Sequence, residues 1–279
     1  MHVLRNALAE FLKEDIGRGD ITSAILPDVK AKAEIICKEM AVIAGLKEAC
    51  ILFELVRCKA KNLVRAGSFV KPNTPIITIT GNAKAILSAE RTALNILMRM
   101  SGIATETRRF VDEVQKINQN VRIACTRKTS PGFRIFDKRA VKVGGGYMHR
   151  MRLDEMVLIK DNHLAITGSI KKAIKTAREI HRTRSKIEIE VGSLDEAIEA
   201  IEAGTDIIML DNLTPRQVRS VVDALKKKGL RKKVMIEVSG GVTHKNVKQY
   251  ASADIDLISI GSLTHSVKAV DMSLAITKS

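Results

Sequence analysis

The chain of 279 residues is poor in aromatic residues, which limits both its core and its partners. Aromatics make up 3% of the sequence and tryptophan is absent, so a core has to be built from aliphatic side chains, alanine and methionine. Proteins that bind nucleic acid usually combine a basic run with aromatic rings that stack on bases. Because no such run occurs here, we expect no nucleic-acid partner.

Cysteine is also scarce, and long apolar runs are missing. The four cysteines form no C-x-x-C pair, and no nearby histidine completes a zinc set. We expect them to be buried thiols of a cytoplasmic protein. The first twenty residues are too charged for a signal peptide, and no apolar stretch reaches the roughly 18 residues that would span a membrane. We therefore expect no membrane partner.

What the chain has in excess is positive charge. Its 47 Lys and Arg outnumber 31 Asp and Glu, which leaves a formal net charge of +16. Such an excess predicts polyanionic partners, and charge alone does not distinguish nucleic acid, a membrane and small phosphorylated metabolites. The densest basic stretches, Lys226–Lys228 and Arg231–Lys233, are interpreted as a solvated helix end and loop.

Six short, mostly apolar runs in the second half predict parallel strands separated by helices. They are Val121–Cys125, Met156–Ile159, Ile187–Val191, Ile207–Leu210, Val234–Val238 and Leu257–Ile260. This alternation is typical of a (β/α) barrel, in which side chains at the carboxyl ends of the strands converge on one mouth. Since a closed barrel has eight strands, six predict an open, incomplete α/β barrel.

The first third reads differently. A helix is expected over residues 1–14, β-strands over 33–38, 40–46, 63–65 and 75–80, and helices over 48–56 and 83–100. Ser101-Gly102 is expected to end the last helix and to mark a domain boundary. The prediction is thus an α/β chain: a sandwich-like N-terminal α/β domain over residues 1–102, a barrel domain over 103–264, and a segment 265–279 that packs back on the first domain.

Five basic side chains follow or flank the predicted barrel strands: Arg127, Lys128, His149, Arg150 and Lys160. Arginine grips a carboxylate or phosphate as a planar fork, whereas lysine is a mobile point charge. Each residue alone also fits a loop salt bridge or a satisfied core histidine. Together they would repel one another without an anion, so the group predicts a site for a multiply anionic substrate.

Two carboxylates are expected at the same mouth. Glu190 and Asp211 end consecutive strands, and neighbouring strands lie about 4.8 Å apart. They can share one metal or one ribose, and hard oxygen ligands of this kind suit Mg²⁺. Glu188 lies one layer deeper on the same face, and we expect it to be a supporting residue with Lys160 or another base as its partner.

Glycine-rich loops close the last two strands. Ser239-Gly240-Gly241 follows one, and Gly261 begins the segment that reaches His265 after the other. In β/α barrels, backbone N–H groups of the final loops and the following helix N-terminus commonly cradle a phosphate. We therefore predict the phosphate side of the site at these loops.

Nine stretches, in order along almost the whole chain, resemble the quinolinate phosphoribosyltransferase family, the carboxylating nicotinate-nucleotide pyrophosphorylases. They are EDIGRGDITS (14–23), AERTALNILMRMSGIAT (89–105), TRKTSPGFR (126–134), KRAVKVGGGYMHR (138–150), LIKDNH (158–163), IEIEVGSLDEA (187–197), MLDNLTP (209–215), IEVSGG (236–241) and ISIGSLTHS (258–266). Tyr147, Met148 and Arg139 depart from the usual pattern of the family, and these departures are expected to affect the shape of the pocket rim.

The resemblance implies roles for individual residues. Arg127, Lys128, His149, Arg150 and Lys160 would face quinolinate and the phosphoribosyl group, and Glu190 and Asp211 would serve the metal and the ribose. Ser239, Gly240, Gly261 and His265 would lie on the phosphate side. In this family each barrel mouth is completed by the N-terminal domain of the partner in a dimer, and Arg91 matches the arginine delivered from that other subunit.

The implied activity is transfer of phosphoribosyl from phosphoribosyl pyrophosphate to quinolinate with decarboxylation, a step of NAD biosynthesis. Its products would be nicotinate mononucleotide, pyrophosphate and CO₂, with Lys128, Lys160, Glu190 and Asp211 as catalytic residues, Mg²⁺ required and no organic cofactor. The alternative is a related molybdenum-operon protein with another acceptor. That protein shares TRKT and GGG-x-x-HR but resembles this chain less at LIKDNH.

Overall fold

The computed structural model describes residues 2–181 and 185–277, and the chain divides into two compact units. Unit 1 comprises Met1–Arg108, Ser130–Gly144 and Ser266–Ser279, and unit 2 comprises Arg109–Thr129 and Gly145–His265. One helix, α3 (Ala83–Gln115), begins in unit 1 and ends in unit 2. No helix in the described ranges is long and apolar enough to cross a membrane.

Unit 1 is built on a four-stranded antiparallel sheet in the order β12-β1-β5-β3. The strands are β1 (Lys30–Cys37), β3 (Lys59–Asn62), β5 (Thr74–Asn82) and β12 (Met272–Thr277), and a small second sheet pairs β2 (Ala41–Val42) with β4 (Phe69–Val70). Every second residue of β1 from Ala33 to Cys37 is fully buried, as expected for a sheet with one covered face. The C-terminal strand β12 returns to pair with β1.

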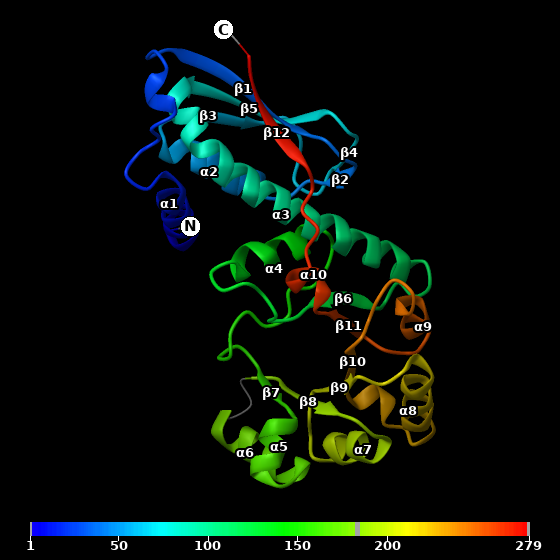
Figure 1. Ribbon diagram of the computed structural model, residues 1–279. Helices are drawn as coiled ribbons and strands as arrows, with labels where there is room; N and C mark the ends of the chain where they lie inside the picture. Colours follow the sequence, from blue (N-terminus) through cyan, green and yellow to red (C-terminus); the bar gives the residue numbers. More distant parts are fainter. Residues whose placement is uncertain (1, 182–184, 278–279) are drawn as a thin grey trace. The chain divides into compact units, whose positions relative to one another are not determined.

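Helices complete unit 1 (Figure 1). They are α1 (His2–Ile16), the 3₁₀ turn η1 (Ser23–Ile25), α2 (Leu46–Leu55), the first part of α3, and α4 (Arg134–Val143). The guanidinium of Arg99 on α3 donates hydrogen bonds of 2.8 and 2.9 Å to the buried carboxylate of Asp137, which ties α4 to α3. The predicted strand at 63–65 is wrong: the strand in this region is the edge strand β3, which ends at Asn62. Its sequence, Lys-Ala-Lys-Asn, lacks the apolar alternation from which a strand is predicted.

The predicted helix end at Ser101-Gly102 is wrong, because α3 continues without a break to Gln115. Ser101 is fully buried, and its hydroxyl exchanges hydrogen bonds of 3.1 Å with the backbone N–H and carbonyl of Ala44. A Cβ on Gly102 would lie 2.1 Å from the carbonyl oxygen of Lys268. The glycine therefore permits the close approach of another backbone within unit 1.

Unit 2 contains a six-stranded parallel sheet in the order β6-β11-β10-β9-β8-β7. The strands are β6 (Arg122–Cys125), β7 (Val157–Ile159), β8 (Ile187–Val191), β9 (Ile207–Asp211), β10 (Met235–Ser239) and β11 (Leu257–Ile260). All six predicted strands are confirmed, with ends shifted by one residue at most. The edge strands β6 and β7 do not pair with each other among the described residues, so the barrel is open, as predicted.

From β7 onward, helices of unit 2 alternate with the strands (Figure 1). The helices of this unit are the end of α3, α5 (Asp161–Thr167), α6 (Ile170–His181), α7 (Leu194–Glu202), α8 (Pro215–Lys227), the 3₁₀ turn η2 (Arg231–Lys233), α9 (Val247–Ala251) and α10 (Ser262–His265). Helix α8 begins with Thr214 and Gln217 in a reciprocal capping box and Pro215 in the first turn.

Candidate active site

A cavity of about 410 Å³ opens at the carboxyl ends of the strands in unit 2. It is lined by Cys125, Thr126, Arg127, Lys128, His149, Arg150, Leu158, Lys160, Glu190, Met209, Asp211, Asn212, Glu237, Ser239, Gly240 and Ser259. Nine of the predicted site residues are in this set: the five basic residues, Glu190, Asp211, Ser239 and Gly240. The structure thus brings together side chains from positions 127 to 240 of the sequence.

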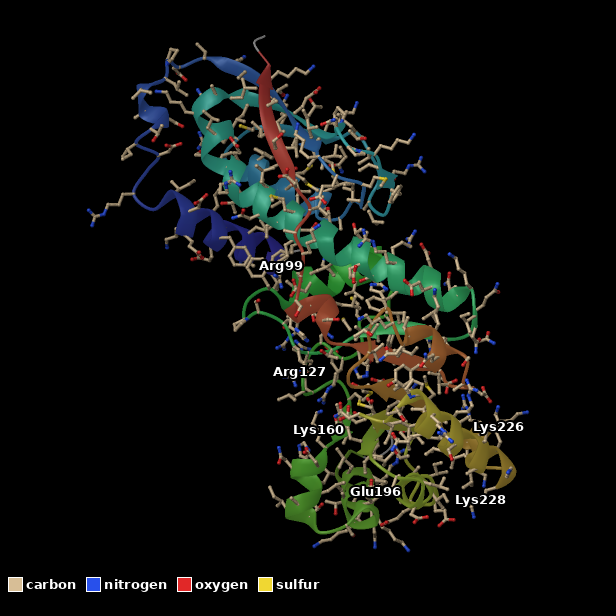
Figure 2. The ribbon with its side chains drawn as sticks, turned by 45° about the vertical axis from the view of Figure 1, so that its right-hand side comes forward. Arg99, Arg127, Lys160, Glu196, Lys226 and Lys228 are labelled. Atoms are coloured by element: carbon tan, nitrogen blue, oxygen red, sulfur yellow. The ribbon has the colours of Figure 1, made fainter. Side chains whose placement is uncertain are left out.

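The basic side chains of this cavity come from three segments. Arg127 and Lys128 follow β6, Arg150 lies in the loop before β7, and Lys160 follows β7. Figure 2 shows Arg127 and Lys160 near each other in unit 2. The Nε of Arg127 is buried and has no hydrogen-bond partner among the residues that the structure describes. Burial and the neighbouring charge of Arg127 lower the pKa of Arg150 from its ordinary value. A buried orphan donor and mutual repulsion between guanidinium groups both favour a bound anion.

The two mouth carboxylates lie on adjacent strands, as predicted. Glu190 is the penultimate residue of β8 and forms an ion pair with Lys160, and Asp211 ends β9. The Oδ2 of Asp211 accepts a hydrogen bond of 2.5 Å from the side-chain amide of Asn212. Both carboxylates line the cavity, and their oxygens are the hard ligands that Mg²⁺ takes in small number when phosphates supply the rest. The donor set fits that metal.

Beneath the mouth, His149 meets two buried glutamates. Its Nε2 lies 3.1 Å from Oε2 of Glu237 on β10 and 3.3 Å from Oε2 of Glu188 on β8. Burial alone would lower the pKa of His149, but hydrogen bonds and charges of the two glutamates raise it to about 9. Burial raises the pKa of Glu188, against the hydrogen bond from His149. Of the partners expected for Glu188, Lys160 or another base, the structure shows the second: the base is His149, whereas Lys160 pairs with Glu190, the residue nearer the mouth.

The last two strands lead into the predicted phosphate loops. Gly240 has a φ of +89°, and a Cβ there would lie 2.2 Å from the side-chain oxygen of Asn212, so only glycine fits this position without displacement. Gly261 precedes α10, and a Cβ on it would come within 3.2 Å of the His265 ring and 3.3 Å of the Lys128 side chain. The loop after β11 is thereby close to Lys128, although neither Gly261 nor His265 lines the cavity itself.

The remaining predicted site residue, Arg91, lies in unit 1. It is an exposed residue of α3. The structure describes one chain, so it leaves the proposed delivery of Arg91 to a partner's site as a prediction.

The three departures from the family pattern have local roles. The Nε of Arg139 donates a hydrogen bond of 2.9 Å to the buried carboxylate of Glu48 within unit 1. Tyr147 extends the sheet beside β6: its N–H donates to the carbonyl of Ile123 at 2.7 Å, and its ring lies 5.4 Å from the Arg122 guanidinium. The Met148 carbonyl accepts a hydrogen bond from the thiol of Cys125. Tyr147 and Met148 therefore hold the segment before His149 against β6.

Glu237, Asn212, Thr126 and Ser259 line the cavity but were not among the predicted site residues. For Glu237 a signal exists: it is the single charged residue in the apolar run Val234–Val238 and shares its parity with Ser239. An acidic residue inside such a run is costly to bury without a cationic partner. The expectation that Glu188 has a basic partner therefore extends to Glu237.

The basic stretches Lys226–Lys228 and Arg231–Lys233 do not line the cavity. Figure 2 shows Lys226 and Lys228 well away from Arg127 and Lys160. Lys226 is in the last turn of α8, and its ammonium lies 3.1 Å from Asp254. This agrees with the interpretation as a helix end and loop.

Comparisons with known proteins give a consistent result over the whole chain. The profile of the quinolinate phosphoribosyl transferase N-terminal domain matches residues 20–101, and that of the C-terminal domain matches residues 103–275. A probable nicotinate-nucleotide pyrophosphorylase [carboxylating] of Archaeoglobus fulgidus is 46% identical over 92% of this chain and 98% of its own length. The protein of the same name from Methanocaldococcus jannaschii is 47% identical over 97% of this chain and 96% of its own.

Solved structures agree with this. The nicotinate-nucleotide pyrophosphorylase of Francisella tularensis is 34% identical and superposes with a TM-score of 0.91, covering 99% of this chain and 96% of that one.

Proposed function

The chain belongs to the quinolinate phosphoribosyl transferase family, and we propose that it transfers the phosphoribosyl group of phosphoribosyl pyrophosphate to quinolinate with loss of CO₂. The products are nicotinate mononucleotide, pyrophosphate and CO₂, and the reaction contributes to NAD biosynthesis. The observation that carries this proposal is the gathering of five basic side chains around one cavity in unit 2. Two carboxylates on quinolinate and the phosphates of the co-substrate supply the anions that such a cavity requires.

The basic residues act first by positioning. Arg127 and Arg150 present planar forks for carboxylates, and Lys128 and His149 add further donors to the cavity. Holding both carboxylates of quinolinate aims the ring nitrogen at the anomeric carbon of the ribose, which removes the entropy cost of finding that geometry. When the nitrogen forms its bond to the anomeric carbon, the bond to pyrophosphate breaks and its electron pair leaves with the pyrophosphate.

The two carboxylates at the mouth act on the ribose. Transfer of a ribosyl group passes through a cationic, oxocarbenium-like state, and Glu190 and Asp211 stabilise the developing positive charge. Glu190 is paired with Lys160, so a bound phosphate would compete for that lysine and free the carboxylate toward the ribose. Mg²⁺ held by Glu190 and Asp211 would supply positive charge next to the pyrophosphate oxygens.

Decarboxylation follows from the new bond. When the C2 carboxylate leaves as CO₂, the electron pair of the broken bond stays on C2, where the positive charge of the adjacent quaternised nitrogen stabilises it, and a proton then bonds to C2. No organic cofactor is needed for this step. The chain's contribution is a cationic pocket that keeps the ring in place while the charge is redistributed.

The loops after β10 and β11 are proposed to bind the 5′-phosphate. Ser239 and Gly240 line the cavity, while Gly261 lies next to both Lys128 and His265. We further propose a cytoplasmic homodimer in which Arg91 of each subunit completes the site of the other.

The test is turnover of two acceptors by the purified protein. With phosphoribosyl pyrophosphate and Mg²⁺ present, quinolinate should yield nicotinate mononucleotide and CO₂, whereas nicotinate should react little, since one carboxylate leaves part of the cationic group without a partner. Comparable turnover of nicotinate, or no turnover of quinolinate, would refute the assignment and favour a relative with another acceptor.

A further inference from the structure

The cavity floor contains a charge arrangement that the proposed chemistry above does not use. Glu188 and Glu237 are both fully buried, one on β8 and the other on β10, and both carboxylates approach the same nitrogen of His149. Oε1 of Glu188 and Oε1 of Glu237 have no hydrogen-bond partner among the residues that the structure describes, and the contact of Glu188 Oε2 with His149 is a long one of 3.3 Å. Buried carboxylate oxygens without partners are costly, so a nearby positive charge is required to offset them.

His149 is the residue placed to supply that charge. Its side chain is 9% exposed, and its backbone has a φ of +53°, a left-handed conformation that is uncommon for a residue with a side chain. Such strain persists only where the surroundings hold it, and it is found mostly at functional sites. The backbone is thus bent so that the ring reaches both glutamates.

The protonation state follows from the contacts. With Nε2 directed at two carboxylates, that nitrogen must carry a proton, and a proton on Nδ1 as well makes the ring a cation that balances one of the two negative charges. Nδ1 has no hydrogen-bond partner among the residues that the structure describes. It is therefore available as a charged donor to a ligand in the cavity.

The surrounding charges explain why two glutamates are needed. The same cavity is lined by the cations Arg127, Lys128, Arg150 and Lys160, and by the anions Glu190 and Asp211. A histidine that is buried beside four cations would lose its proton near neutral pH. Burial is the largest single effect and lowers the pKa of His149, but the hydrogen bonds and charges of the two glutamates together outweigh it and raise the pKa.

We propose that Glu237, supported by Glu188, is a positioning residue that keeps His149 as a cation on the cavity floor, where the ring binds a carboxylate of the acceptor. The proposal rests on the proposed function for the identity of that acceptor. The held cation itself does not depend on the acceptor. The site would then bind its anionic acceptor with nearly constant strength across neutral and mildly alkaline pH, since His149 would lose its charge only near pH 9.

The test removes the charge of Glu237 and keeps its shape. Glu237→Gln retains an oxygen that can accept from Nε2 but no longer favours the imidazolium. We expect kcat/KM for quinolinate to fall about tenfold between pH 6.5 and pH 8 in this variant, because His149 then loses its proton in that range, and to change little in the wild type. The fall should be in KM more than in kcat, and Glu237→Asp should restore part of the wild-type profile.

The chain offers a matched control in a second carboxylate–histidine pair. Glu113 lies 2.9 Å from Nδ1 of His244, and neither residue lines the cavity. Glu113→Gln should leave the pH profile unchanged. In a His149→Asn background, Glu237→Gln should add no further pH dependence, because both act through the same ring.

A second measurement needs no substrate. In protein with labelled histidines, the resonance that disappears in His149→Asn should titrate near pH 9 in the wild type and at least one unit lower in Glu237→Gln. A wild-type value near 6.5, or an unchanged profile in a folded Glu237→Gln, overturns the proposal. If the resonance titrates only after a chelator is added, a metal ion occupies the place of the proton, and the proposal is also wrong. Absence of wild-type turnover of quinolinate instead refutes the proposed function and the acceptor assigned to His149, while the titration still decides whether the cation is held.

Discussion

Replacing Gly240 by alanine tests how the loop after β10 shapes the candidate site. Gly240 has a φ of +89°, and the new Cβ would lie 2.2 Å from Oδ1 and 2.8 Å from the backbone nitrogen of Asn212. Asn212 cannot move freely, because its N–H donates to the carbonyl of Ser239 at 2.9 Å and its side-chain amide donates to Asp211. The substitution should therefore displace Asp211 together with its neighbour.

The expected loss of folding free energy in Gly240→Ala has two contributions. A left-handed backbone costs a residue with a Cβ about 1–2 kcal/mol, and forcing extra atoms into a filled space costs about 1–3 kcal/mol more. Gly241→Ala is the matched control: its φ is +61°, but nothing lies within 4 Å of the new Cβ. The control should show only the backbone cost, so the difference between the variants isolates the overlap with Asn212.

The assay measures both folding and catalysis. We expect urea unfolding to show a larger loss of free energy for Gly240→Ala than for Gly241→Ala. The KM for phosphoribosyl pyrophosphate should rise about tenfold for each 1.4 kcal/mol of overlap that is expressed in binding. Equal effects of the two substitutions on stability and KM would refute the reasoning, since they would show that the contact with Asn212 has no consequence.

Three further outcomes are expected. Arg150→Ala should lower kcat/KM by two or more orders of magnitude, about 3 kcal/mol, with unfolding free energy nearly unchanged; unfolding of the variant would instead show a structural role. Glu190→Gln and Asp211→Asn should each raise the Mg²⁺ concentration needed for half-maximal rate while quinolinate binding, measured by calorimetry, stays intact; an unchanged metal dependence would contradict their proposed role. Arg91→Ala and Lys160→Ala, each inactive alone, should recover about a quarter of wild-type activity when they are mixed and allowed to exchange subunits. No recovery despite demonstrated exchange would place Arg91 outside a partner's site.

Much of unit 2 could be predicted from the sequence because its determinants are local. An apolar run of four or five residues between helical segments is read as a buried parallel strand wherever the chain goes next. The carboxyl ends of such strands meet at one edge, so the sequence alone places Lys160, Glu190 and Asp211 at one mouth, and the structure has all three at the cavity. The start of α8 is equally local, since Thr214, Pro215 and Gln217 lie within one turn.

Tertiary structure decided what depends on partners distant in sequence. Ser101-Gly102 has the composition of a helix end, yet α3 continues through it because Ala44 satisfies the hydroxyl and the Lys268 backbone occupies the space that a side chain would need. Similarly, the base that meets Glu188 is His149, and Glu237 shares it, although the three are separated by 39 to 88 positions. Periodicity predicts the face of a strand on which a side chain lies. The identity of its neighbour depends instead on the order of the strands and on the conformation of the loops. His149 reaches the two glutamates from a left-handed backbone conformation, which no local pattern predicts.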